Sequence, residues 1–456
     1  MLLRFRCKNF RSIREEQELS LIASKTRTDE RSESLIETPI DDLKLLRCAA
    51  IYGANASGKS NVLDAFAAFG RAVSNSWRSW KPNGPIPEFD PFLLDGTSQE
   101  AQIHFELTFL LGSQIYRYSF RFDRSKFNEE LLVDVTGNDK VLFHRSPESA
   151  GIRFPNKNLG KTLSDKRHLE GIERDVRPNS LFLSAAAQRA HPLLSRIYAA
   201  LSDSFNAMHW KNMPGRQRYT AELCSSVEFR SQILKMIRFA DAGISNLEIS
   251  RREYPDSEMR TLRAVMAALK ESDPEKFAEV SEEPEVLPSI PEVRMAHLGM
   301  DGRHYFLDES KESDGTQAYF SALGPILRAL NSGSVLLIDE LESSLHPKLA
   351  RELVGVFNSA VLNPKGAQFV FTTHNTNLLD LDLLRRDQIW FTEKSSDGAT
   401  RLYSLSDYQP RTSQNIEAGY LGGRFGAVPF LDEGLLRESL IPGEPAQASL
   451  GFSGER

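Results

Sequence analysis

Two kinds of hydrophobic spacing divide the chain into segments of different secondary structure. Between residues 103 and 122 apolar side chains occupy every second position, first from Ile103 to Phe109 and then from Tyr116 to Phe122. This period of two, interrupted at a glycine-serine pair, predicts an antiparallel hairpin with one buried face. Uninterrupted apolar runs at 334–338 and 368–371 instead predict strands of a parallel sheet that is covered on both faces.

The amino-terminal part combines strands with a helix. Residues 2–10 and 45–52 are rich in large apolar side chains and predict two strands, the first of them at the edge of a sheet. From Asn61 to Val73 apolar residues recur at helical spacing, with alanines and no proline between them, which predicts a helix. Shorter strands are predicted at 141–143, 151–154 and 181–183.

A middle segment separates two α/β parts. From about residue 190 to 270 the apolar spacing predicts mainly helices. From Glu271 to Glu292 the chain is acidic and rich in proline, which is typical of an exposed linker. We therefore expect 1–190 and 294–456 to build one α/β fold together, with 191–293 as a helical insertion followed by an acidic linker.

Composition narrows the class of protein. The 456 residues are 40% hydrophobic and 26% charged with a net charge of -6, which is typical of a globular chain whose whole surface does not attract nucleic acid. The composition is still compatible with a local basic groove, for example around the paired arginines at 251–252 and 385–386. The three cysteines are far apart, which argues against a disulfide framework or a zinc module. With neither a signal peptide nor an apolar run of about 20 residues, we expect a cytoplasmic protein that does not enter a membrane.

A glycine-rich loop follows the second predicted strand. Residues 53–60 read GANASGKS and match G-x-x-x-x-G-K-[ST] between a strand and a helix, as the motif requires. In such a loop backbone N–H groups surround a phosphate, the lysine reaches the β and γ phosphates, and the last hydroxyl ligates magnesium. The pattern predicts a site for ATP and Mg²⁺ formed by Gly53, Ala54, Asn55, Ala56, Ser57, Gly58, Lys59, Ser60 and Asn61.

Polar residues also follow the two apolar strands of the last third. Asp339 and Glu340 end the first strand, where adjacent carboxylates repel each other unless a cation or solvent stabilises them. We expect Asp339 to hold magnesium and Glu340 to orient and deprotonate the attacking water. His374 directly follows the second strand, where its imidazole could contact the γ-phosphate. Lys59 and Glu340 are therefore predicted to be catalytic, whereas His374 by itself fits a structural histidine as well as a catalytic one.

The order of these motifs carries a family resemblance. Residues 313–317, SDGTQ, form a small-residue turn that leads into an apolar helix, another phosphate-binding geometry. The ABC-type ATPases have their motifs in the same order: the P-loop, the small-residue turn, the strand that ends in Asp-Glu, the SSLHP loop (here 343–347), and a strand followed by a histidine. The chain resembles their SMC, RecF and OLD branch, and most closely the stand-alone AAA ATP-binding proteins of abortive-infection and related phage-defence operons. Other segments that carry the resemblance are KNFRS at 8–12, RDQIWFTEK at 386–394 and YLGGRFGAVP at 420–429.

The resemblance implies a fold and a mechanism. The fold is α/β, a P-loop NTPase of the ABC-ATPase head type with an antiparallel β subdomain beside a parallel core. In the mechanism two heads enclose two nucleotides, so that the P-loop, Asp339, Glu340 and His374 act from one subunit. The signature turn of this chain reads SDGTQ, whereas the family pattern is SGGQ. Gln99 and Gln102 are only candidates for a Q-loop. The resemblance assigns Ser313, Gly315 and Thr316 to completion of the partner's site and Ser343 and Ser344 to a D-loop at the seam.

Three activities are open for what ATP drives. The preferred one is a homodimer or higher homo-oligomer whose nucleotide-dependent assembly controls a separately encoded effector, a nuclease, in anti-phage defence. The second is a clamp of the RecF or SMC type that closes on duplex DNA, although no heptad pattern for coiled-coil arms is present. The third is a nuclease that uses Asp380 and Asp382, but this pair fits surface or capping acids better.

Overall fold

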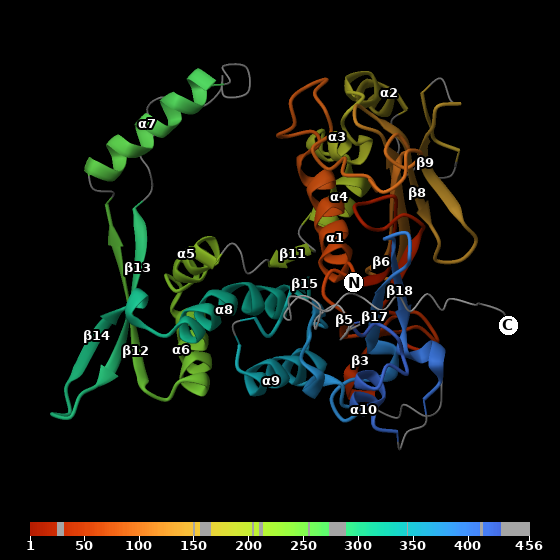
Figure 1. Cartoon of the computed structure of the whole chain (residues 1–456). Coiled ribbons are helices and arrows are strands. Elements are labelled where there is room, and N and C mark those ends of the chain that lie inside the picture. The colour runs from red at the N-terminus through yellow and green to blue at the C-terminus, as the bar shows by residue number, and fades with distance from the viewer. Residues whose placement is uncertain are drawn as a thin grey trace, which may run out of the picture.

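Two large β-sheets lie on either side of helix α1 (Lys59–Asn75), as Figure 1 shows. Alanines and phenylalanines of α1 share one hydrophobic core with residues of both sheets. Burial of this apolar surface is the main stabilising contribution to such an arrangement. The computed structural model describes residues 1–24, 32–148, 151–155, 166–202, 205–208, 213–253, 256–272, 289–343, 345–410 and 414–429.

The core sheet has six strands and is parallel except at one edge. Its order is β11-β15-β16-β5-β17-β18, and only β17 and β18 pair antiparallel. Crossover helices between parallel strands cover both faces of such a sheet, which explains the uninterrupted apolar runs in the sequence. The strands are β5 (Cys48–Gly53), β11 (Phe205–Met208), β15 (Val335–Ile338), β16 (Gln368–Thr372), β17 (Ile389–Lys394) and β18 (Thr400–Ser404).

The second sheet is antiparallel and has seven strands in the order β10-β9-β8-β7-β6-β1-β2. The predicted hairpin at 103–122 forms its centre, and its alternate apolar residues face α1. The strands are β1 (Leu2–Lys8), β2 (Gln17–Ser20), β6 (Ile103–Leu111), β7 (Gln114–Phe122), β8 (Phe127–Asp134), β9 (Lys140–Arg145) and β10 (Ile152–Arg153), and the small pair β3 (Leu35–Glu37) and β4 (Lys44–Leu46) lies apart from it.

Strand β5 shows how the core sheet joins two hydrophobic cores. Ala49 and Ile51 face α1, whereas Cys48, Ala50 and Tyr52 face the opposite side, because successive side chains of a strand point to opposite faces. All six residues of β5 are buried. Helices α8 (Asp314–Ser332), α9 (Pro347–Asn358) and α10 (Ile416–Leu421) supply the second core.

Three local predictions were wrong. Strand β1 lies between β6 and β2 and is not an edge strand. The predicted strand 45–52 is two strands in different sheets, with Arg47 between them. The predicted strand 181–183 starts helix α3 (Phe182–Gln188), because the buried carboxylate of Glu130 accepts hydrogen bonds from the first free N–H groups of that helix.

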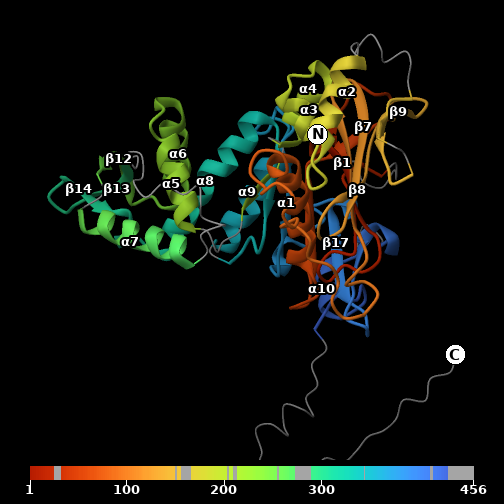
Figure 2. The same cartoon turned by 90° about the horizontal axis from the view of Figure 1, so that it is seen from above.

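The middle segment forms a projecting arm as well as helices. Strands β12 (Ile244–Arg252), β13 (Ile290–Leu298) and β14 (His304–Asp308) make an antiparallel ribbon, and α7 (Asp256–Ser272) lies between β12 and β13 in the chain. Figure 2 places this arm beside the body that holds both sheets. Most of the predicted acidic linker, 273–288, lies outside the described residues. The other helices are α2 (Lys166–Asp175), α4 (Pro192–Ser202), α5 (Met213–Leu223) and α6 (Val227–Ala240).

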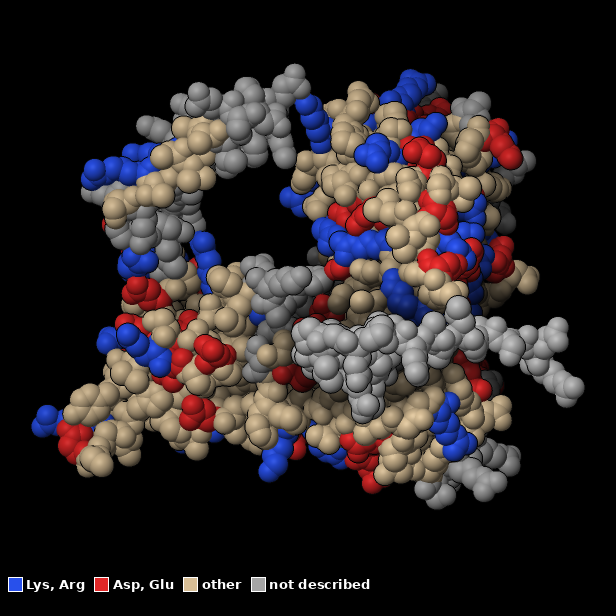
Figure 3. All heavy atoms as spheres, in the orientation of Figure 1, with Lys and Arg blue, Asp and Glu red and all other residues tan. Residues whose placement is uncertain are grey.

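The proposed limits of the insertion stay a prediction, and one strand complicates them. Strand β11 lies inside 191–293 and pairs with β15, so this segment also supplies an edge of the core sheet. Figure 3 shows an opening between the arm and the body, with Lys and Arg side chains on its rim. Within the described residues, no helix has the length and apolar character that crossing a bilayer requires.

Candidate functional site

The loop between β5 and α1 has the curled conformation of a phosphate-binding loop. Gly58 is the N-cap of α1 with φ +103°, and Ala56 has φ +62°. A Cβ atom on Gly58 would overlap the Thr400 hydroxyl, and one on Gly53 would lie 2.5 Å from Ser57 Oγ. Both glycines are therefore required by close packing and, at Gly58, by the backbone conformation.

A hydroxyl brace, formed by Ser12, Ser57, Thr392 and Thr400, holds this loop from outside. Thr400 Oγ1 donates to Ser57 O at 2.9 Å and lies 2.8 Å from Ser12 Oγ, while Ser57 Oγ lies 2.7 Å from Thr392 Oγ1. Asn61 Nδ2 adds a bond to Ser12 Oγ at 2.6 Å. The brace connects the KNFRS segment with β17 and β18. Sequence reasoning missed its threonines, since isolated hydroxyl residues in strands carry no recognisable signal.

Lys59 lies inside the loop that precedes it. Its Nζ donates to Gly53 O at 2.9 Å and to Ala54 O at 3.0 Å, and the residue is only 6% exposed. Burial lowers the pKa of Lys59, and the nearby carboxylates of Asp339 and Glu340 oppose this effect. The ammonium group is thus positioned where a bound phosphate chain would replace carbonyl contacts with stronger charged ones.

Asp339 and the P-loop serine meet at the end of the core sheet. Ser60 Oγ donates to Asp339 Oδ1 at 3.0 Å, and Thr372 Oγ1 donates to the same oxygen at 2.7 Å. The Thr372 hydroxyl also accepts from Glu340 N at 2.7 Å, and Glu340 has φ +52°. A hydroxyl and a carboxylate as neighbouring oxygen donors suit Mg²⁺, which usually keeps several waters. The residues present therefore fit the predicted metal.

His374 follows β16 on the same edge of the sheet and is exposed. Partial burial of its ring lowers its pKa, the positive charge of Lys59 lowers it further, and nearby carboxylates such as Glu342 oppose the shift, so that the neutral imidazole is favoured. Glu342 holds the backbone beneath it, because its carboxylate accepts hydrogen bonds from Thr373 Oγ1 at 2.6 Å and from His374 N. Sequence reasoning gave no role to Glu342 or to Thr372.

The signature turn does not join this site within one copy. Ser313 is the N-cap of α8, and its Oγ accepts from Thr316 N at 3.1 Å; Gly315 belongs to the same exposed first turn. In Figure 1 this end of α8 lies beside the arm, whereas its other end leads into β15. At 1.5 Å per residue, the 19-residue helix separates the two ends by about 28 Å. Of the two predicted D-loop residues, Ser343 is exposed and lies three positions after Glu340, and Ser344 lies outside the described residues.

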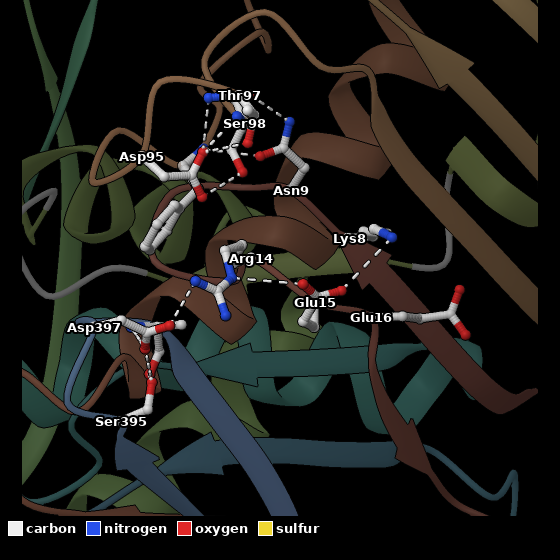
Figure 4. A network of polar contacts seen from close by, with 12 residues as sticks. Lys8, Asn9, Arg14, Glu15, Glu16, Asp95, Thr97, Ser98, Ser395 and Asp397 are labelled. Carbon is white, nitrogen blue, oxygen red and sulfur yellow. Dashed lines mark hydrogen bonds and ion pairs between the residues drawn. The ribbon is translucent and has the colours of Figure 1, made fainter.

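Figure 4 shows how the amino-terminal segment joins the turn between β17 and β18. Arg14 pairs with Asp397 at 2.5 Å, and Asn9 Nδ2 donates to Ser98 O at 2.8 Å. Asp95 Oδ1 accepts from the backbone N–H groups of Thr97 and Ser98 and fixes that loop. The Q-loop candidates Gln99 and Gln102 lie in or directly after this loop, and Gln99 Nε2 donates to Leu93 O in an exposed position.

The residues behind the alternative activities have structural partners. Asp380 accepts from Arg351 at 2.7 Å and from Asp382 N at 2.7 Å, as a turn-capping acid does. Within the described residues, no three His, Cys, Asp or Glu side chains converge as a metal site. Arg251 pairs with Glu222, and Arg252 pairs with Glu292, each at 2.8 Å. Arg385 and Arg386 are buried and so are not part of a surface groove.

Comparison with known proteins places this geometry in a family. The profile of the family described as "AAA domain, putative AbiEii toxin, Type IV TA system" matches residues 48–380. The chain is also similar to the SMC head domain from Thermotoga maritima, with 13% identity over 88% of this chain and 98% of that chain and a TM-score of 0.39. A second similar structure is an SMC head bound to the C-winged helix domain of ScpA, with 12% identity over 88% of this chain and 97% of that chain and a TM-score of 0.38. Because the family match spans more than half of the sequence, the chain belongs to this AAA family.

Proposed function

We propose that the protein is an ATP-driven switch in which two copies enclose two ATP molecules, and that this assembly controls a separately encoded effector in anti-phage defence. One observation carries the proposal. The P-loop, Asp339, Glu340 and His374 share one edge of the core sheet, whereas the signature turn lies at the other end of α8. A second copy is the simplest source of a signature turn at that site.

Residues of one copy would bind ATP and prepare water for attack. The P-loop N–H groups and Lys59 hold the phosphate chain, while Glu340 at the end of β15 orients and deprotonates the water. The neutral imidazole of His374 can donate a hydrogen bond to the γ-phosphate without adding a full charge. Ser60 and Asp339 would hold Mg²⁺, which neutralises charge on the phosphate oxygens when bound.

The second copy would contribute the exposed first turn of α8. The N-terminus of a helix attracts anions, because its free N–H groups and its dipole point outward. Ser313, Gly315 and Thr316 form this turn, and the Ser313 hydroxyl is already oriented by its bond from Thr316 N. Ser343, exposed beside Glu340, would contact the partner at the seam.

The solution mass of the Glu340→Gln protein with and without Mg-ATP tests this assembly. The substitution leaves the P-loop intact but removes the base that activates water. Bound ATP should then persist, and the solution mass should rise as two copies assemble. Ser313→Arg should abolish the increase in mass, because the larger side chain would occupy the space where the signature turn contacts the nucleotide of the other copy. Ser332→Arg is the matched control at the other, exposed end of α8 and should leave the increase unchanged. ATP binding without a change in mass or compactness would refute the two-copy mechanism.

The defence role draws on the family description, which names a putative toxin of a type IV toxin–antitoxin system. We propose a nuclease as the effector. Cells that carry the gene with its neighbouring genes should resist phage, and Lys59→Ala should remove that resistance because nucleotide binding is lost. Full resistance with the Lys59→Ala protein would contradict an ATP-controlled switch.

A DNA clamp is the second candidate, and the opening with its basic rim in Figure 3 favours it. Such a clamp would bind duplex DNA with an affinity that falls steeply with salt, since bound counterions are released. Titration of a labelled duplex at 50 and 200 mM salt with the Glu340→Gln protein and Mg-ATP measures this. Absence of binding at the lower salt concentration would reject the clamp.

A further inference from the structure

Glu342 connects two polypeptide segments that both belong to the candidate site. It lies between Glu340 and the exposed Ser343, in a turn closed by a 2.9 Å bond from Ser343 N to Glu340 O. Its two carboxylate oxygens accept from Thr373 Oγ1 and from His374 N, which belong to the segment after β16. The neighbouring bond from Leu341 N to Thr372 O, at 2.9 Å, holds the same two segments together.

The backbone of His374 is held by the same carboxylate. The histidine is exposed, and its backbone N–H donates to the Glu342 carboxylate. Thr373 is fully buried, and its Oγ1 both donates to Glu342 and accepts from Asn375 N at 3.0 Å. A charged acceptor makes such hydrogen bonds short and strong, so the carboxylate fixes the conformation of residues 373–375.

We propose that Glu342 is a positioning residue, which holds His374 in place and makes that placement depend on the turn 340–343. This inference rests on the proposed function, because Ser343 of the same turn would then face the second copy. Docking of that copy would press on the turn, and the Glu342 carboxylate would transmit the displacement to His374. Hydrolysis would in this way respond to assembly through one side chain.

ATP turnover by variants tests the positioning role. Glu342→Ala should lower kcat by about 10- to 100-fold with little change in KM, the range typical of residues that orient a functional group. Glu342→Gln should stay within a few-fold of wild type, because its carbonyl can still accept from His374 N while its amide donates to Thr373 Oγ1. Glu352→Ala, an exposed glutamate of α9, is the matched control.

A double-mutant cycle separates positioning from a general loss of structure. If Glu342 acts through His374, adding Glu342→Ala to His374→Ala should cause no further loss of kcat. Independent, multiplicative losses would overturn the proposal. Thr373→Val removes the other end of the network without changing side-chain volume much, and it should reproduce the kcat effect if Glu342→Ala folds poorly.

Hydrogen exchange at the His374 amide decides the question even without turnover. In ATP-free protein this amide should exchange at least 10-fold faster in Glu342→Ala than in wild type, whereas Glu342→Gln should keep the protection. Unchanged exchange in Glu342→Ala would refute the positioning role. A wild-type protein that does not hydrolyse ATP would refute only the proposed function, because exchange still reports on Glu342.

Discussion

Glu309 gives the stability of the protein a predictable pH dependence. It begins the short helical turn η4 (Glu309–Lys311) just before the signature turn. Its Oε1 is buried and has no hydrogen-bond partner in the described part of the chain, although the Gln217 side chain hydrogen-bonds to the carboxyl group. Burial raises the pKa of Glu309 from 4.5 to about 7, and the bond from Gln217 opposes this shift.

The sign of the effect follows from the raised pKa. The folded chain binds this proton more tightly than the unfolded chain, so the stabilisation is complete below pH 4.5 and is lost as the pH rises through 7. At 1.36 kcal/mol per pKa unit, the loss amounts to about 3 kcal/mol. Because the carboxyl group is not fully buried, we expect about 2 kcal/mol between pH 5 and pH 8.

Urea unfolding at pH 5 and pH 8 measures this difference. The free energy of unfolding of Glu309→Gln should change less between the two pH values than that of wild type, by about 2 kcal/mol. Glu352→Gln, on the exposed face of α9, should behave like wild type. Identical pH dependence in wild type and Glu309→Gln would show that the carboxyl group is hydrated in the folded protein and that the reasoning fails.

Three further substitutions test the packing and the site. Gly58→Ala should abolish nucleotide binding by calorimetry, because its Cβ overlaps a side chain and its φ is positive, whereas Gly355→Ala has open space and should be neutral or up to about 1 kcal/mol stabilising. Asp387→Leu removes one partner of a buried ion pair and should cost about 3–5 kcal/mol in urea unfolding; Glu37→Gln, in an exposed pair, should cost under about 1 kcal/mol. Thr372→Val removes the hydroxyl that donates to Asp339, so the Mg²⁺ concentration needed for half-maximal turnover should rise about 10- to 100-fold. An unchanged Mg²⁺ titration would contradict a role of Thr372 in orienting Asp339.

The α/β core could be predicted because its signals are local. Alternation at 103–122 gave the hairpin, and the apolar runs before Asp339 and His374 gave two neighbouring parallel strands. Parallel strands end at the same edge of a sheet, so the motif order alone brought these side chains toward the P-loop. The predicted roles of the individual site residues stay predictions.

The errors arose where distant residues decide the structure. The segment 181–183 is apolar enough for a strand, but Glu130, about 50 positions earlier in the chain, caps it as a helix. Strand β11 is short and lies between helices, and it exists because β15 offers an unpaired edge. The hydroxyl brace likewise depends on Ser12 and Thr400, whose proximity no local pattern reveals.

The hydroxyl brace also has a consequence for how the protein is made. Thr400 contacts Ser57 across 343 positions of the chain. At a synthesis rate of about 5–20 residues per second, the ribosome completes this partner about 20 to 70 s after the loop itself. Until then the nascent chain carries a P-loop without its outer support. The nascent protein should therefore gain its full affinity for ATP only after Thr400 has been synthesised, which keeps shorter nascent chains from engaging a partner.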